Sequence, residues 1–162
     1  MTGDAVVEVG DHPTAISAEH NPAVVLSLVV PTYDEAGNIE VLLRSLHRVL
    51  SDRHVGFEIL VVDDDSPDRT WEVAGKLTSE LPGLRVIRRT GTSGLATAVT
   101  CGWVHARGGI LGVIDGDGQH PPAVVVDLLD AMVDRIDVAV ASRHLPGGGV
   151  SNWAALRRML SR

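Results

Sequence analysis

Short apolar runs alternate with amphipathic stretches along the chain from Val24 onward. The apolar runs predict strands at residues 24–30, 57–62, 84–87, 110–114 and 137–141, the first of them ended by Pro31. Apolar residues spaced three and four apart predict helices at residues 38–50, 68–82, 95–106, 121–135 and 153–162. Because nearly all-apolar strands alternate with helices, the pattern predicts an α/β fold with a mainly parallel sheet covered by helices on both faces.

The N-terminal segment lacks this periodicity and mixes Gly, Asp, His, Pro, Ser and Asn. We interpret residues 1–22 as a mostly disordered tail and residues 23–162 as one domain, which agrees with a length of 162 residues.

Composition narrows the class of protein. The chain is 44% apolar, which is enough for a core, and its net charge of -7 with a single lysine argues against a nucleic-acid partner. The single cysteine, Cys101, excludes an internal disulfide and fits a reducing compartment. No apolar run approaches the ~20 residues that span a bilayer, and the N-terminus has no signal-peptide pattern. These features predict a cytoplasmic protein.

Polar segments follow four of the predicted strands. They are "PTYDE" after the first strand, "DDDSPD" after the second, "DGDGQH" after the fourth and "SRHLPGGG" after the fifth. In a parallel sheet, ligands bind at the carboxyl ends of the strands. We therefore expect these four segments to converge on one edge and to form a ligand site.

The segment "DGDGQH" places two carboxylates two residues apart. Asp115 and Asp117 can hold a divalent cation, with Gln119 as a neutral oxygen ligand, and Mg²⁺ or Mn²⁺ suits this donor set. Gly116 allows the backbone to come close to a ligand. An acidic turn is the alternative interpretation, since Asp-Gly pairs are common in turns. His120 fits either a supporting role at such a site or a helix-capping or surface position.

Three further acidic residues, Asp63, Asp64 and Asp65, directly follow the second predicted strand. Carboxylates accept hydrogen bonds from the N–H and O–H groups of a base or ribose. The alternative is capping of the next helix, for which Asp68 is the best placed residue.

Arginines at strand ends are candidate phosphate partners. Arg88 and Arg89 follow the third predicted strand and Arg143 ends the fifth. The alternative for each is a solvated surface charge, which is the commoner role of a lone arginine.

With these segments in order, the chain resembles family 2 glycosyltransferases of the dolichol- or polyprenol-phosphate mannose synthase type. The matching segments are "VVPTYDEAGNI", "EILVVDDDSPDRT", "RRTGTSGLATA", "VIDGDGQHPP" and "SRHLPGGGVSNWAALRRMLSR", which extend over residues 26–162. The resemblance implies a GT-A fold, a Rossmann-like α/β architecture. Because family members continue well past Arg162, we expect the C-terminal part of that fold to be missing from this chain.

The resemblance also implies roles for individual residues. Those that match the base and ribose site are Pro31, Tyr33, Glu35, Val62, Asp63 and Asp64. Those that match the metal and diphosphate site are Asp115, Gly116, Asp117 and Gln119. Arg143 matches an arginine near the donor phosphates, and Arg157 matches a region proposed to meet the acceptor phosphate. Asp117, Arg143 and Arg157 are the residues implied to be catalytic.

The implied reaction is an inverting, metal-dependent transfer of a sugar from a nucleotide sugar to a lipid phosphate. The expected donor is GDP-mannose, with a UDP-sugar as the other possibility, and the expected acceptor is a polyprenyl or dolichyl phosphate. The expected location is the cytoplasmic face of a membrane, through surface contact or a membrane partner subunit. A phosphate is already ionised near neutral pH, so it needs orientation and charge neutralisation more than a general base.

Three other interpretations stay open at this stage. A non-catalytic nucleotide-binding remnant of such an enzyme would keep the donor segments alone. A phosphoacceptor receiver domain needs a strand-end lysine after Asp115, whereas Lys76, the only lysine, precedes it. A nucleotidyltransferase for sugar activation needs an N-terminal glycine-rich loop with a lysine, which the sequence lacks.

The sequence also departs from the family pattern. Asp34 stands where the family usually has Asn, Asp65 replaces a Gly, and Ala96 replaces the second Gly of a Gly-Leu-Gly turn. Asp34 and Asp65 add negative charge where a diphosphate is expected. Asp tolerates the left-handed conformation better than most residues, so Asp65 can occupy a glycine position in a turn.

Overall fold

The computed structural model describes residues 6–10, 21–132 and 136–142. Its strands are β1 (Val6–Val9), β2 (Leu26–Thr32), β3 (Phe57–Asp63), β4 (Leu84–Arg89) and β5 (Ile110–Val113). Its helices are α1 (Ile39–Ser51), α2 (Thr70–Lys76), α3 (Leu95–Val104) and α4 (Ala123–Ala131), with a 3₁₀ turn, η1 (Leu77–Ser79), after α2. The chain divides into two compact units, residues 1–126 and 127–162.

The first unit is built on a parallel sheet. Its strand order is β1-β4-β3-β2-β5, and each strand pairs in parallel with its neighbours. The central strands β2 and β3 are in register from Leu26 beside Phe57 to Thr32 beside Asp63. The predicted α/β class with a parallel sheet is therefore confirmed.

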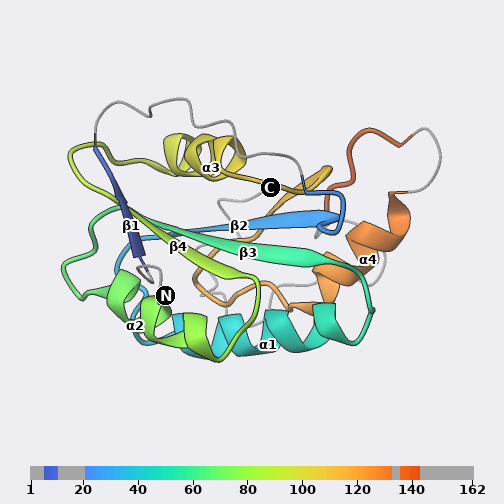
Figure 1. Ribbon diagram of the computed structural model, residues 1–162, viewed down its shortest axis with the longest axis horizontal. Coiled ribbons are helices and arrows are strands. Elements are labelled where there is room, and N and C mark those ends of the chain that lie inside the picture. The colour runs from blue at the N-terminus through green and yellow to red at the C-terminus, as the bar shows by residue number, and fades with distance from the viewer. Residues whose placement is uncertain (1–5, 11–20, 133–135, 143–162) are drawn as a thin grey trace, which may run out of the picture. The chain divides into compact units, whose positions relative to one another are not determined.

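Helices cover both faces of this sheet (Figure 1). On one face, Leu43 and Leu46 of α1 and Ala74 of α2 are buried in one cluster with Leu28 and Val30 of β2. On the other face, α3 lies over Val29 and the neighbouring side chains of β3. Both faces of β2 and β3 are thus buried, which is why these strands are continuous apolar runs in the sequence.

A glycine sets the distance between α3 and the sheet. A Cβ atom on Gly102 would lie 2.6 Å from both Cγ atoms of Val29, so a larger residue would push the helix away from β2. At the other end of α3, the amide of Gly94 donates to Asp64 and holds the helix N-terminus beside the carboxyl end of β3.

The prediction that Pro31 ends the first strand was wrong, because β2 continues to Thr32. The amide of Ile114 donates to the carbonyl of Val29, and the pairing with β5 ends at Val29 and Val113. The backbone nitrogen of Pro31, like the backbone groups of Val29, is directed toward β5, but Pro31 lies beyond the last paired residue of that strand. Its missing N–H therefore costs no hydrogen bond in the sheet.

The interpretation of residues 1–22 as a tail was wrong for Val6–Val9, which form β1 at the edge of the sheet beside β4. Val6 packs on the α2 side of the sheet and Val9 on the α3 side. A segment of four residues is too short to show periodicity, and its order comes from pairing with the exposed edge of β4.

The predicted strand at residues 137–141 is also absent. Residues 136–142 have no regular secondary structure, and Val138 and Val140 are each 75% exposed. An apolar alternation gives strand propensity, but a strand forms only where a neighbour satisfies its backbone groups. The predicted helix at residues 153–162 lies outside the described residues.

Candidate functional site

Three of the four polar segments predicted to converge, "PTYDE", "DDDSPD" and "DGDGQH", follow strands that end at the same edge of the sheet. The loops after β2, β3 and β5 all leave the carboxyl ends of neighbouring parallel strands. The loop after β4 leads into α3 at the same edge. The segment "SRHLPGGG" lies outside the described residues apart from Ser142, and so do Arg143 and Arg157.

Successive hydrogen bonds join the loop after β2 to the loop after β3. The amides of three consecutive residues donate to side-chain oxygens: Asp34 to Ser66 Oγ (3.0 Å), Glu35 to Thr70 Oγ1 (2.9 Å) and Ala36 to Asp68 Oδ2 (2.8 Å). Each bond satisfies a backbone donor that a free loop would expose to water. We call these two segments the joined loops, since the hydrogen bonds hold them together and pre-organise the site that they border.

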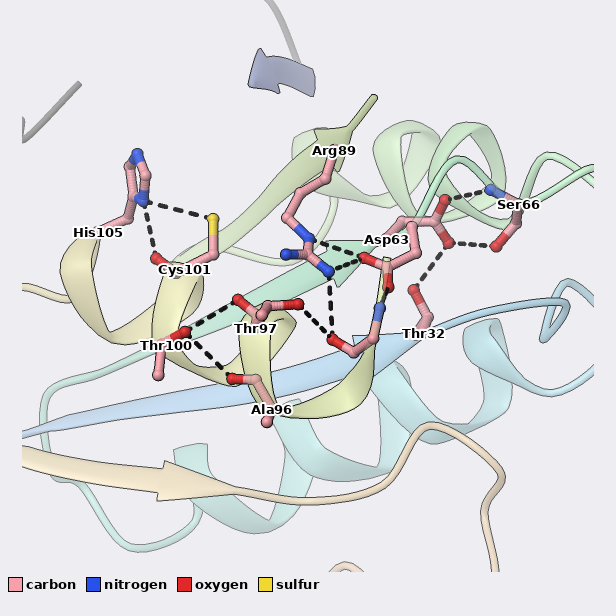
Figure 2. A network of polar contacts seen from close by, with 11 residues as sticks. Thr32, Asp63, Ser66, Arg89, Ala96, Thr97, Thr100, Cys101 and His105 are labelled. Atoms are coloured by element: carbon pink, nitrogen blue, oxygen red, sulfur yellow. Dashed lines mark hydrogen bonds and ion pairs between the residues drawn. The ribbon is translucent and has the colours of Figure 1, made fainter. Parts of the chain in front are cut away.

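Asp63 holds the joined loops in place from inside the protein (Figure 2). Its fully buried carboxylate accepts hydrogen bonds from Ser66 N (2.9 Å), Ser66 Oγ (2.6 Å) and Thr32 Oγ1 (2.8 Å). Burial raises the pKa of Asp63 despite these bonds. A base or ribose would have to compete with three protein donors for this carboxylate. Contact of Asp63 with a nucleotide stays a prediction.

Asp64 makes a second buried contact, with Arg89. Its Oδ1 accepts from Nε of Arg89 at 2.7 Å and also from Nη2, and its Oδ2 accepts from the amide of Gly94 at 2.7 Å. The side chains of Arg89 and Asp64 are only 5% and 8% exposed. This clamp joins the ends of β3 and β4 to the start of α3.

The prediction that Arg88 and Arg89 are phosphate partners is not supported, because the structure commits both cations to carboxylates. Arg88 pairs with Asp65 (2.6 Å) and Glu8 (2.8 Å), and its guanidinium lies 4.2 Å from the ring centroid of Trp71. Since Arg88 neutralises Asp65, the extra negative charge at that position is balanced within the protein.

The loop after β5 is held close to the end of β2. A Cβ atom on Gly116 would lie 2.9 Å from Cγ2 of Thr32 and 3.1 Å from the carbonyl oxygen of Pro31. A larger residue here would require the Thr32 side chain or the Pro31 carbonyl to shift. The residues on either side of Gly116, Asp115 and Asp117, are thereby brought beside the joined loops.

Each of these two acidic residues has a polar contact with a nearby residue in the described part of the chain. Asp117 Oδ1 accepts from the amide of Gln119 at 3.0 Å, and His120 Nε2 lies 3.6 Å from Asp115 Oδ2. The side chain of Asp115 is 51% exposed. Both the turn-forming and the ligand-binding interpretation of this segment agree with these contacts.

The donor set fits a hard divalent cation that brings other ligands with it. Within the described part of the chain, no three His, Cys, Asp or Glu side chains gather closely enough to hold a metal ion by themselves. Two carboxylates and the Gln119 amide oxygen leave coordination positions for phosphate oxygens and water, as Mg²⁺ and Mn²⁺ require. Metal binding stays a proposal.

The other predicted nucleotide-site residues lie on the joined loops and strand ends. Pro31 and Val62 are buried register partners in β2 and β3. The Tyr33 side chain is 61% exposed. Glu35 is half-buried, and its Oε2 accepts from Nδ2 of Asn38 at 2.8 Å.

Sequence reasoning missed the residues that join these loops, chiefly Thr32, Ser66 and Thr70. Each is a Ser or Thr at or beside a strand end or helix start, and that position is the signal that could have identified it. The structure adds that each is buried.

The structure also explains a departure from the family pattern. Asp65 has a φ of 54° and Asp34 a φ of 61°, so both occupy the left-handed conformation that Asp tolerates.

The prediction that Asp68 caps α2 is correct only in part: the N-cap residue is Arg69, and Asp68, one residue earlier, binds the first amide of the helix. Its Oδ1 accepts from the amide of Thr70 at 3.0 Å, while its Oδ2 holds Ala36. Burial by itself would raise the pKa of Asp68, but the hydrogen bonds from Thr70 and Ala36 outweigh it and hold this pKa below its usual value. Such a carboxylate stabilises the fold above its unfolded pKa, and the stabilisation is lost as the pH falls through its folded pKa.

We therefore expect Asp68→Ala to lower the free energy of unfolding by about 1–2 kcal/mol at neutral pH, since the amides of Thr70 and Ala36 lose their acceptor. The loss should shrink as the solution is acidified. Urea unfolding at a series of pH values measures it. Asp52→Ala, at the exposed C-terminal end of α1, is the control and should change stability little. An equal loss at all pH values would contradict the lowered pKa.

Comparison with known proteins gives a consistent result. The family model described as "Glycosyl transferase family 2" matches residues 27–161. A dolichol-phosphate mannosyltransferase of Pyrococcus furiosus is 44% identical over 137 residues, which cover 85% of this chain and 38% of that protein. A polyprenol monophosphomannose synthase of Mycolicibacterium smegmatis is 35% identical over 166 residues, covering 100% of this chain and 60% of that protein.

A dolichol-phosphate mannosyltransferase of Saccharomyces cerevisiae is 34% identical over 137 residues, covering 83% of this chain and 51% of that protein. The chain thus spans between 38% and 60% of the length of these three relatives.

Proposed function

Because the chain belongs to glycosyl transferase family 2, we propose that it acts in the transfer of mannose from GDP-mannose to a polyprenyl or dolichyl phosphate, with inversion and with a divalent metal. The names of the three relatives support mannose as the sugar and a lipid phosphate as the acceptor. The observation that carries the proposal is the approach of Gly116 to Pro31 and Thr32, because it sets the acidic loop beside the joined loops.

The nucleotide would bind along the joined loops after β2 and β3. Tyr33 offers an exposed aromatic ring that a base can stack on. Glu35 and Asp64 offer carboxylate oxygens, which accept hydrogen bonds from base or ribose. The hydrogen bonds that fix these loops reduce the ordering cost of binding, since little backbone has to move.

Asp115, Asp117 and Gln119 would hold Mg²⁺ or Mn²⁺. When bound, such an ion neutralises charge on the leaving nucleoside diphosphate. The protein's own contribution is to fix both carboxylates on a loop that Gly116 seats against β2. Since Arg88 and Arg89 are paired elsewhere, Arg143 is the proposed arginine for the donor phosphates.

The acceptor phosphate would act as the nucleophile without a general base, because it already carries negative charge at neutral pH. Its oxygen forms the bond to the anomeric carbon of mannose while the bond from that carbon to the diphosphate breaks. The electron pair of the broken bond leaves with GDP. We propose Arg157 as the residue that meets the acceptor phosphate and orients it for this attack.

A lipid acceptor requires access to a membrane. We propose that the protein works at the cytoplasmic face, through contact with the membrane surface or with a membrane-embedded partner subunit. In the segments that the structure describes, no helix combines the length and apolar character needed to cross a bilayer.

The test is calorimetry with GDP and UDP, each with and without Mn²⁺, followed by transfer of radiolabelled mannose from GDP-mannose to a short-chain polyprenyl phosphate. We expect GDP to bind more tightly with Mn²⁺ than without it and more tightly than UDP. Metal-independent binding would overturn the metal site. Donor binding with no transfer would favour a nucleotide-binding remnant, and no binding of either nucleotide would overturn the proposed function.

A further inference from the structure

Two arginine–carboxylate pairs link β3 to β4, one near each end of the strands: the Arg89–Asp64 pair is buried, whereas Arg85 of the other pair is 27% exposed. Arg85 pairs with Glu58 at 2.8 Å near the amino end, and Arg89 pairs with Asp64 just beyond the carboxyl end of β3. Both pairs have similar chemistry and lie on the same two strands. Only the Arg89 pair lies at the edge where the candidate nucleotide site is formed.

We propose that Arg89 is a positioning residue of the donor site, which orients the Asp64 carboxylate toward the nucleoside part of the donor. The inference rests on the proposed function and deepens it. It assigns to Arg89 a place in nucleoside recognition, acting through Asp64 and the turn at Gly94, in place of the phosphate contact that the sequence suggested.

The geometry of the clamp supports this assignment, and Figure 2 shows Arg89 with its polar contacts drawn as dashed lines. Arg89 directs Nε and Nη2 at the same oxygen of Asp64, Oδ1, and its Nη2 also donates to the carbonyl of Gly94 at 3.3 Å. The amide of Gly94 donates a hydrogen bond to Asp64 Oδ2 at 2.7 Å. Gly94 has a φ of 128°, which residues with a Cβ atom rarely adopt. The turn therefore keeps this conformation only with glycine.

The clamp leaves part of the carboxylate available for a ligand. A carboxylate has about four acceptor positions on its two oxygens. Arg89 occupies Oδ1 twice, whereas Oδ2 receives only the amide of Gly94 from the described residues. Oδ2 therefore keeps capacity for one more donor, such as an N–H of a base or an O–H of a ribose, and its direction is fixed by the contacts at Oδ1.

Stability alone explains the pair poorly. Taking a guanidinium and a carboxylate out of water is costly, and apolar side chains of similar volume often stabilise a fold as well or better. The Arg89 side chain is only 5% exposed, so its guanidinium has lost nearly all of its hydration and the desolvation cost is close to its maximum. A functional demand on the direction of Asp64 accounts for keeping the charges at this place.

The test uses the full chain and two variants, Arg89→Met and Arg89→Lys, with Arg85→Met as the matched control. Calorimetry in Mn²⁺ measures the dissociation constants of GDP and of inorganic pyrophosphate, and thermal unfolding measures stability. We expect Arg89→Met to raise the dissociation constant of GDP about tenfold or more, as loss of one oriented contact to a charged group does, and to change that of pyrophosphate less than about twofold.

The conservative variant and the control separate positioning from general stability. Arg89→Lys keeps the charge but lacks the planar fork, so its GDP affinity should fall between those of the wild type and Arg89→Met. Arg85→Met should lower the melting temperature and leave GDP affinity unchanged. If Arg89→Met does not fold, Arg89→Lys decides the question, and wild-type GDP affinity in that variant would overturn the inference.

Other outcomes also count against it. Unchanged GDP affinity in folded Arg89→Met would overturn the positioning role. Equal losses for GDP and pyrophosphate would make Arg89 a phosphate ligand instead. Failure of the unmodified chain to bind GDP would overturn the proposed function, and the inference with it, and this failure is recognisable because it needs no variant.

Discussion

Replacing Asp117 by alanine should weaken Mn²⁺-dependent GDP binding by about a hundredfold and lower mannose transfer by at least as much. The reason is electrostatic. The diphosphate brings its own negative charge to an edge that already carries Asp115 and Asp117, and only a bound cation makes these charges compatible. A single remaining carboxylate at Asp115 would hold that cation poorly. Calorimetry and radiolabelled transfer, each over a range of Mn²⁺ concentrations, measure both losses.

Asp117→Asn separates the metal site from an acidic turn. The asparagine keeps an oxygen that can accept from the amide of Gln119, which the structure places 3.0 Å from Asp117 Oδ1. It removes the charge that a hard cation requires. If Asp117 only forms a turn, Asp117→Asn should bind GDP as the wild type does, and the metal site would have to be abandoned. Without Mn²⁺, both variants should bind GDP at least as tightly as the wild type, because each removes one carboxylate charge that repels the diphosphate.

The sequence predicted the fold best where periodicity is long and burial is two-sided. β2 and β3 are apolar on both faces, and α1 carries a regular apolar stripe, so pattern alone identified all three. It failed where an element depends on a neighbour. Val6–Val9 become a strand only because β4 has a free edge, and residues 136–142 have a strand pattern without forming a strand.

The sequence predicted the place of the site better than its internal contacts. Convergence of the polar segments follows from parallel strands, and strand topology can be inferred from alternation of strands and helices. Which charges neutralise one another cannot be inferred in this way. Arg89 and Asp64 are 25 residues apart in sequence, and only the register of β3 against β4 brings them together. A cation that sequence reasoning assigned to phosphate is therefore part of the protein's own framework.

The second large effect is on stability, and it concerns Asp63. Asp63→Ala should lower the free energy of unfolding by about 3 kcal/mol, because the amide and hydroxyl of Ser66 and the hydroxyl of Thr32 lose their acceptor in a fully buried place. For a chain of this length the loss corresponds to a fall of about 10 °C in melting temperature. Asp63→Asn should cost only about 1 kcal/mol, since hydroxyls can reverse their role and accept from the new amide.

The pH dependence of stability in the wild type and in Asp63→Asn tests whether burial raises the pKa of the Asp63 carboxyl. Burial raises the pKa of Asp63 in the folded state, so folding favours the protonated form. The contribution of Asp63 to stability is therefore fully present below its unfolded pKa, and it is lost as the pH rises through its folded pKa. Asp63→Asn cannot titrate at this position. Urea unfolding of the two proteins at matched pH values should show the wild type gaining on Asp63→Asn as the solution is acidified, while the other carboxyl groups affect both equally. A difference that stays constant, or that favours the variant in acid, would mean that the three hydrogen bonds outweigh burial and keep this carboxylate ionised.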